Sequence, residues 1–97
     1  MSIQVIIKRK WQTNNPEALF PLLTKIRSLA QKQPGYISGE TLRSLDDPED
    51  YMVVSQWETE GDWKNWLQSE ERRDLQSKVD SLIGEKTFYE IYEPVSH

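Results

Sequence analysis

The sequence predicts a single α+β domain in which two helices cover one face of a four-stranded antiparallel sheet. Its 97 residues are enough for one domain and leave no room for a second. Four runs rich in β-branched and aromatic residues are separated by two longer stretches in which apolar residues recur every three or four positions. In chain order, these runs predict strand, helix, strand, strand, helix and strand.

The first strand and the start of the first helix are marked by an abrupt change of pattern. A β-branched cluster, Ile3 to Ile7, leads into Lys8-Arg9-Lys10, which suits a strand buried on both faces at its start and emerging into solvent. We expect this basic triplet to be solvated, with Arg9 pointing opposite to its neighbours. Asn14-Asn15-Pro16 then supplies an N-cap oxygen and a first helical residue.

The first helix carries one apolar stripe and ends near Gln33, where Pro34-Gly35 stops it. Pro21 lies inside the helical pattern, so it should either kink the first turns or move the start of the helix later. The sequence leaves these two alternatives open. The stripe consists of Leu19, Leu22, Leu23, Ile26, Leu29 and Ala30.

Two strands follow the first helix directly. Tyr36 to Ser44 alternates between two faces, and Tyr51 to Glu58 resumes the strand pattern after a turn at Asp46-Asp47-Pro48. Because the connection is short and rich in turn residues, we expect these two strands to form an antiparallel hairpin.

The second helix begins and ends with recognisable signals. Thr59 to Asp62 resembles a capping box, and Gly84 is placed to close the helix. The polar stretch Ser69 to Arg73 interrupts the apolar face and predicts a break near Ser69, which could cap a second segment. Thr87 to Tyr92 predicts the last strand. The apolar face consists of Trp63, Trp66, Leu67, Leu75, Val79, Leu82 and Ile83.

This order of elements is that of a ferredoxin-like split βαβ unit, with both helices on one face of the sheet. The other face is left bare, although large apolar side chains are distributed over both faces of the strands. We therefore predict a homodimer in which two copies pack their bare faces together. Val53 and Tyr89 are expected to lie on that face, where an introduced Asp would disrupt association.

Composition excludes several classes of function. A net charge of −4 is opposite to the basic footprint of nucleic-acid binding. The chain has no cysteine and a single histidine, His97, so no metal site is expected. No apolar run is long enough to span a membrane, and Met1 to Lys10 lacks the pattern of a targeting segment, which predicts a cytoplasmic protein.

Several motifs, taken in order, resemble a known family. They are Gln33 to Glu40, Gln56-Trp57-Glu58, Trp63, and Trp66 to Ser69. This ordered set resembles the antibiotic biosynthesis monooxygenase superfamily of dimeric α+β barrels, and the resemblance covers Ile3 to Tyr92. It implies a cofactor-independent oxygenase that binds an electron-rich phenol or quinol inside each barrel, where the anion of the substrate reduces O₂ directly.

The resemblance also places individual residues. Trp57 matches a Trp of the polyketide-tailoring members, whereas Val53 stands at the position of their Asn and Trp63 at that of their Tyr. Trp63 keeps an N–H donor but cannot ionise, and Val53 offers no polar group.

A second branch of the family degrades haem, and its Trp against the porphyrin corresponds to Trp66. Gln76 stands at the position of that branch's axial His, and Ile7 falls near the position of its first-strand Asn. An amide is a poor iron ligand beside imidazole, so haem degradation is not expected.

The candidate residues for binding a small aromatic ligand are Tyr36, Trp57, Trp63, Asn65 and Trp66. Each also has a structural interpretation. The Trp rings would fill the core or an interface, Tyr36 would pack on its strand, and Asn65 would be solvated. No catalytic residue is assigned, and no cofactor is expected.

Two functional hypotheses follow. One is a cofactor-free monooxygenase acting on a phenolic or quinol compound. The other is a non-catalytic dimeric module that binds a small aromatic ligand or has a regulatory role. Glu70 to Asp74 is expected to form an exposed helical face in either case, because runs of mixed charge are rarely buried.

Overall fold

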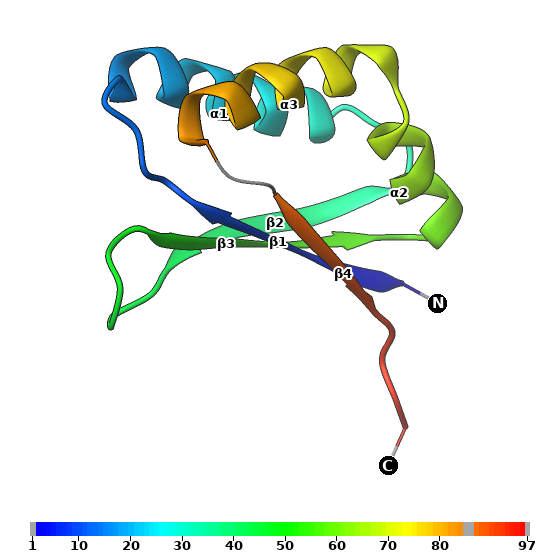
Figure 1. The fold of residues 1–97 in the computed structure, drawn as a ribbon. Coiled ribbons are helices and arrows are strands. Elements are labelled where there is room, and N and C mark those ends of the chain that lie inside the picture. The colour runs from blue at the N-terminus through cyan, green and yellow to red at the C-terminus, as the bar shows by residue number, and fades with distance from the viewer. Residues whose placement is uncertain (1, 85–86, 97) are drawn as a thin grey trace.

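A computed structural model describes residues 2–84 and 87–96 of the chain. The elements follow the order β-α-β-β-α-α-β along the chain (Figure 1). They are β1 (Ile3–Lys10), α1 (Pro16–Ala30), β2 (Tyr36–Arg43), β3 (Asp50–Trp57), α2 (Glu60–Leu67), α3 (Glu70–Ile83) and β4 (Phe88–Tyr92).

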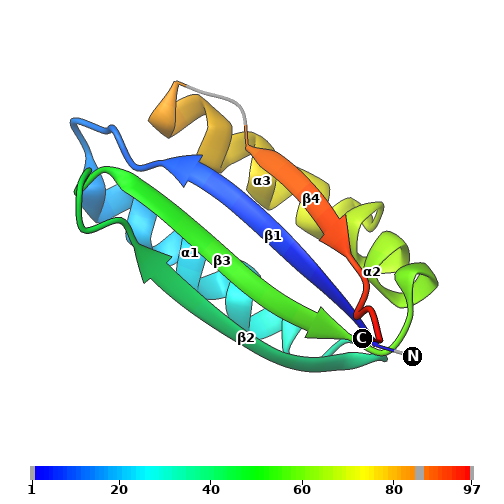
Figure 2. The ribbon, with the colours of Figure 1, turned by 90° about the horizontal axis from the view of Figure 1, so that it is seen from below.

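The strands form one antiparallel sheet in the order β2-β3-β1-β4. The helices lie on one face of this sheet, and the other face is open in the single chain (Figures 1 and 2). β2 and β3 form the predicted hairpin, with Arg43 opposite Tyr51 next to the turn. The predicted α+β, ferredoxin-like fold is confirmed.

Helix α1 begins where its capping signal predicts. The side-chain oxygen of Asn15 accepts a hydrogen bond from the amide of Ala18 at 3.3 Å, and Pro16 is the first helical residue. The helix continues through Pro21, so the alternative of a later start is wrong. It ends at Ala30, before the predicted Gln33, and a turn leads from there into β2.

The predicted break in the second helix is confirmed at Ser69, which separates α2 from α3. The hydroxyl of Ser69 donates to the carbonyl of Trp66 at 2.8 Å and accepts from the amide of Arg72 at 3.2 Å. Thr59 caps α2 as predicted, by accepting from the amide of Asp62 at 3.0 Å. Gly84 closes α3 in the left-handed conformation, with φ of 70°.

The burial of β1 differs from the prediction. Its buried residues alternate strictly, as Val5, Ile7 and Arg9, and the half-buried Ile6 points to the open face. The prediction that the whole basic triplet is solvated is wrong for Arg9, which is only 6% exposed. The long aliphatic stem of an arginine lets it occupy a core position that its charge alone would exclude.

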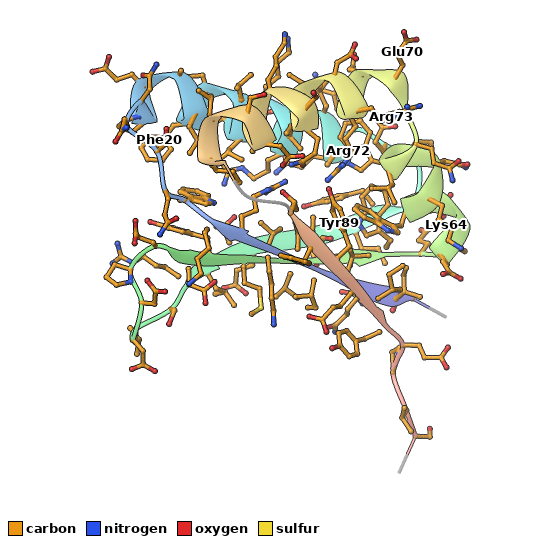
Figure 3. The ribbon with its side chains drawn as sticks, viewed as in Figure 1. Phe20, Lys64, Glu70, Arg72, Arg73 and Tyr89 are labelled. Carbon is orange, nitrogen blue, oxygen red and sulfur yellow. The ribbon has the colours of Figure 1, made fainter. Side chains whose placement is uncertain are left out.

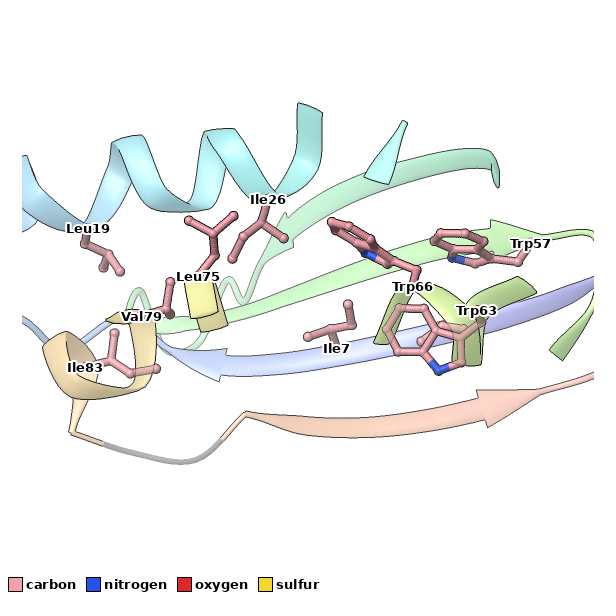
Figure 4. Packing of buried hydrophobic residues seen from close by; sticks show 10 residues of the cluster. Ile7, Leu19, Ile26, Trp57, Trp63, Trp66, Leu75, Val79 and Ile83 are labelled. Carbon is pink, nitrogen blue, oxygen red and sulfur yellow. The ribbon is translucent and has the colours of Figure 1, made fainter. Parts of the chain in front are cut away.

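The core between sheet and helices has two ends of different composition (Figure 4). The end nearer the start of α1 is aliphatic and contains Leu19, Leu75, Val79 and Ile83. The opposite end contains the tryptophans Trp57, Trp63 and Trp66, all of them at most 2% exposed. Ile7 and Ile26 lie between the two groups.

The prediction that Val53 and Tyr89 lie on the open face is wrong. Both pair with Ile7, which is buried under the helices, and paired residues of neighbouring strands share a face. The register instead places Ile6 and Val54 opposite each other on the open face. The apolar residues of that face are Ile6, Leu42, Met52, Val54, Phe88 and Tyr92.

None of the helices within residues 2–84 and 87–96 is both long enough and apolar enough to cross a membrane.

Candidate functional site

A cavity of about 210 Å³ lies between the sheet and the helices. Residues from β1, β2, β3 and all three helices contribute to its wall. A buried cavity of about 150 Å³ is large enough to bind benzene, so this space fits one substituted aromatic ring. Its aromatic lining residues are Trp11, Phe20, Tyr36, Trp57, Trp63 and Trp66.

The tryptophan wall is held in place by ring contacts and one hydrogen bond. Trp57 meets Trp63 at a centroid distance of 5.7 Å and Tyr36 at 5.4 Å, in both cases edge to face. The indole N–H of Trp57 donates to the hydroxyl of Ser55 at 3.2 Å, and that hydroxyl donates to the carbonyl of Val5 at 3.4 Å. Trp57 is therefore oriented by the sheet itself.

Tyr36 reaches the cavity across β2 because residue 39 is a glycine. A Cβ atom at position 39 would lie 2.5 Å from the Tyr36 hydroxyl, which is closer than van der Waals contact permits. Gly39 thus allows the phenol to lie over its own strand, and both residues line the cavity. Tyr36 is half-buried and supplies a hydroxyl that can donate or accept at this wall.

A second aromatic group, Trp11 just after β1 and Phe20 of α1, also lines the cavity. Trp11 stacks on Tyr51 with a centroid distance of 3.7 Å and an interplanar angle of 10°, and it contacts Phe20 at 5.6 Å. Phe20 is 49% exposed. The wall therefore reaches the protein surface at α1, which offers a ligand a way in.

Two buried arginines also line the cavity. Arg9 from β1 is 6% exposed and Arg72 from α3 is 2% exposed. Their Nη2 atoms donate to the same oxygen, Oε1 of Gln76, at 2.9 Å from Arg9 and 3.4 Å from Arg72. The two positive groups therefore lie side by side inside the domain.

Arg72 is held over the sheet by aromatic contacts as well. Its Nη2 donates to the hydroxyl of Tyr89 at 3.0 Å, and Figure 3 shows the two side chains close together between α3 and the sheet. The guanidinium carbon lies 5.2 Å from the centre of the Tyr89 ring and 5.5 Å from that of Trp63. These distances are within the range of cation–π contacts.

Burial has a measurable electrostatic consequence at Arg9. Its pKa is lowered to about 10, chiefly because the guanidinium is removed from water. The charge of Arg72 also lowers this pKa, while Tyr89 and Asp80 raise it. Arg9 is still a cation at neutral pH.

Asp80 is connected to the arginines through Gln76. The amide nitrogen of Gln76 donates to the carboxylate of Asp80 and to the hydroxyl of Thr87, both at 2.8 Å. The hydroxyl of Thr87 donates to the same carboxylate oxygen at 3.2 Å. Gln76 therefore separates the two cations from this carboxylate instead of letting them pair with it.

Four of the five residues predicted for ligand binding line this cavity. They are Tyr36, Trp57, Trp63 and Trp66. Asn65 is exposed and is not among the lining residues, because Trp63 and Trp66 occupy the inner side of the short helix α2. A role for any of these residues in ligand binding stays a prediction.

The sequence interpretation missed both arginines. Arg72 falls within the stretch Glu70 to Asp74 that was expected to be exposed, and this expectation is wrong for that residue. Helical spacing offered a signal, since Arg72 precedes the buried Leu75 by three residues and Val79 by seven. For Arg9 the signal was the alternation that begins at Val5 and Ile7.

No group of three or more His, Cys, Asp and Glu residues capable of holding a metal ion occurs in the described part of the chain. The polar side chains that line the cavity carry guanidinium, hydroxyl and indole groups, together with the carboxylate of the exposed Glu40.

Comparison with known proteins agrees with this architecture. The family model described as antibiotic biosynthesis monooxygenase matches residues 3–78, and the chain belongs to this family. No curated protein matches the chain.

Three solved structures illustrate the shared fold. A conserved protein from Methanosarcina mazei Go1 superposes with a TM-score of 0.84 at 18% identity, covering 95% of this chain and 91% of that one. SnoaB, a cofactor-independent oxygenase from Streptomyces nogalater, has a TM-score of 0.83 at 11% identity, with 99% and 95% covered. Rv0793 from Mycobacterium tuberculosis has a TM-score of 0.83 at 14% identity, with 100% and 98% covered.

Proposed function

We propose that the protein is a cofactor-independent monooxygenase acting on a small phenolic or quinol compound, and that it works as a homodimer. The observation that carries the proposal is the cavity of about 210 Å³ with its aromatic wall, in a chain of the antibiotic biosynthesis monooxygenase family. SnoaB, with the same fold, is a cofactor-independent oxygenase, which supports the reaction class.

The proposed reaction takes all its electrons from the substrate. A quinol loses a proton, its anion passes one electron to O₂, and the resulting radical pair combines. One oxygen atom then enters the ring and the other leaves as water, so that quinol and O₂ give hydroxyquinone and water. The protein has to bind a flat ring, stabilise its anion and exclude water from the radicals.

The cavity offers groups for these tasks. Trp57, Trp63 and Trp66 provide faces and edges against which a flat ring can pack. Tyr36 lines the cavity, and we expect its hydroxyl to hydrogen-bond a substrate oxygen. Asn65, which is exposed on α2, is not expected to act in this cavity.

An oxygen electrode tests the activity directly. A panel of hydroquinones and anthrones should consume O₂ faster with the protein than without it, in the absence of added flavin, metal or haem. Val53→Phe should fill the cavity and lower both ligand binding and O₂ uptake, because Val53 lines that space. The control change Leu45→Phe adds bulk at a fully exposed position outside the cavity and should leave ligand binding unchanged.

The non-catalytic module remains the alternative, and one observation favours it. Val53 and Trp63 both line the cavity, and neither side chain can ionise to serve as a base. Ligand binding without O₂ uptake above the protein-free rate, across the whole panel, would replace the oxygenase proposal with this alternative.

Haem degradation is not favoured by the site. Gln76, which stands where the haem-degrading branch has its axial His, is 8% exposed. Its amide oxygen accepts from Arg9 and Arg72, and its nitrogen donates to Asp80 and Thr87. This side chain is fully engaged within the protein.

The proposed dimer rests on the apolar open face of the sheet, at whose centre Ile6 lies opposite Val54. Light scattering should report about twice the chain mass at micromolar concentration. Val54→Asp should halve that mass, since it would bury an unpaired charge between the copies. Arg73→Asp changes an exposed position on α3 and should leave the dimer intact. A wild-type monomer, or a dimer unaffected by Val54→Asp, would contradict the assembly.

A further inference from the structure

We propose that Arg9 and Arg72 form an oxyanion site and that the natural ligand of the cavity is an aromatic carboxylate. The inference deepens the proposed function, because it names the substrate class of the same cavity. Its subject is a charge-bearing part of the ligand, which is separate from the ring that would be oxidised.

Neither of the two cations contacts a counter-ion among the described residues. Within residues 2–84 and 87–96, no carboxylate forms a salt bridge with Arg9 or Arg72. The carboxylate of Asp80 bonds to the amide of Gln76 and to neither guanidinium group. Glu40, the carboxylate that borders the cavity, is exposed. Burying a charge without a partner is costly, and here two like charges share one neutral acceptor.

Most of the guanidinium donors have no acceptor within residues 2–84 and 87–96. Each guanidinium carries five N–H bonds. The guanidinium hydrogen bonds of Arg9 and Arg72 among the described residues use only the Nη2 atoms. In the part of the chain that the structure describes, the Nε atom of each is buried without a hydrogen-bond partner, and so is Nε1 of Trp63. Buried donors are almost always satisfied in native proteins, so this cluster indicates an acceptor that binds from outside the chain.

A carboxylate is the anion that fits the two guanidinium groups best. A planar guanidinium matches a carboxylate through two parallel N–H···O bonds, and two neighbouring guanidinium groups can share its two oxygens. A carboxylate is already charged at neutral pH, whereas a phenol must first lose a proton. The remaining wall is aromatic and the volume suits one substituted ring. Together these features describe a hydroxylated aromatic acid.

The contact of Arg72 with aromatic rings adds a geometric reason. Its guanidinium lies against Trp63 and Tyr89, and its Nη2 is tied to Tyr89 and Gln76. An arginine held from several sides loses little conformational freedom when a ligand binds. The site is therefore organised before the anion arrives.

Calorimetry with a matched pair of ligands tests the inference. The probes are 2,5-dihydroxybenzoate and its methyl ester, which share one quinol ring and differ in the negative charge. The acid should bind the wild-type protein about tenfold more tightly than the ester, or better, because hydrogen bonds to charged groups are the strong ones. Equal affinities, or tighter binding of the ester, would overturn the inference.

Substitutions assign the effect to the two arginines. Arg9→Met and Arg72→Met should each remove the preference for the acid while the ester still binds. Arg73→Met removes the same charge from the next residue of α3, which is exposed, and should keep the preference (Figure 3). A preference that survives in both Arg9→Met and Arg72→Met would place the anion elsewhere and overturn the inference. If either variant fails to fold by circular dichroism, the wild-type comparison of acid and ester decides.

The outcome separates this inference from the proposed function. Tight binding of the acid without O₂ uptake would leave the oxyanion site standing and remove the oxygenase. If the ester and the acid bind with equal affinity and support equally fast O₂ uptake, the oxygenase proposal stands and the oxyanion site is removed.

Discussion

The two ends of the core are built differently, although the same sheet and helices enclose both. None of the aliphatic residues Leu19, Leu75, Val79 and Ile83 lines the cavity. All three buried tryptophans of the opposite end line it, and so do Arg9 and Arg72. The aliphatic end is therefore filled, whereas the tryptophans border a space that is open to a ligand.

The difference follows from the shapes of the side chains. Branched aliphatic groups interdigitate until little space remains. The rigid rings of Trp57 and Trp63 meet edge to face, at 63°, and both border the cavity. The buried charge of Arg72 further prevents apolar groups from filling the remaining space without cost. We therefore expect the aliphatic end to supply stability and the aromatic end to supply ligand binding.

The largest effect on stability is expected when a side chain of the aliphatic end is truncated. Leu19→Ala removes a fully buried side chain of α1 and should lower the free energy of unfolding by about 3 kcal/mol. Urea denaturation measures this change. Ligand affinity, measured where the variant is still folded, should be unchanged because Leu19 does not line the cavity. A loss of affinity as large as the loss of stability would show that the two ends are not separate.

A smaller change in stability, of opposite sign, is expected at Arg9, which lines the cavity. Arg9→Met replaces a desolvated cation by an apolar chain of similar length, and the free energy of unfolding should stay the same or rise by about 1–2 kcal/mol. Thermal unfolding without ligand measures it. Since Gln76 keeps its bond from Arg72, the amide is not left without a donor. A destabilisation of several kcal/mol would mean that Arg9 is part of the structural core.

The smallest effect is expected at Ser69, which joins α2 to α3 between Trp66 and Arg72. Ser69→Ala removes the bond to the amide of Arg72 and the bond to the carbonyl of Trp66, and should cost about 1 kcal/mol of stability. Because the cap positions both neighbours, ligand affinity should fall as well. Ser77→Ala, at an exposed position of α3, is the control and should change neither quantity. Equal behaviour of the two variants would argue against a role for this cap.

Local chemistry accounts for most of what could be predicted from the sequence. The caps at Asn15, Thr59 and Ser69 and the left-handed Gly84 depend on hydrogen bonds or dihedral angles within a few residues. Signals of that range are visible in the chain itself. The order of the elements, and with it the ferredoxin-like sheet, followed from these boundaries and from the spacing of apolar residues.

The side of the sheet on which a strand residue lies could not be predicted from the pattern of its own strand. Val53 and Tyr89 are apolar or aromatic residues in strands where both faces carry such residues, so alternation alone did not say which side the helices cover. Their pairing with Ile7 decides it. Strand register is a property of two segments at once, and one segment read alone does not contain it.

The candidate site, too, could be predicted only in part from the sequence. The sequence alone predicted four of the six aromatic residues of the cavity wall and missed Trp11 and Phe20. Trp63 and Trp66 share one side of a helix, and Trp57 ends a strand. Only the tertiary structure decided that Arg9 and Arg72 are buried. Arg9 meets Gln76 across 67 positions of the chain, and Arg72 meets Tyr89 on a different element. A charge is buried when distant segments enclose it and supply its contacts, and such an environment exists only once the chain has folded.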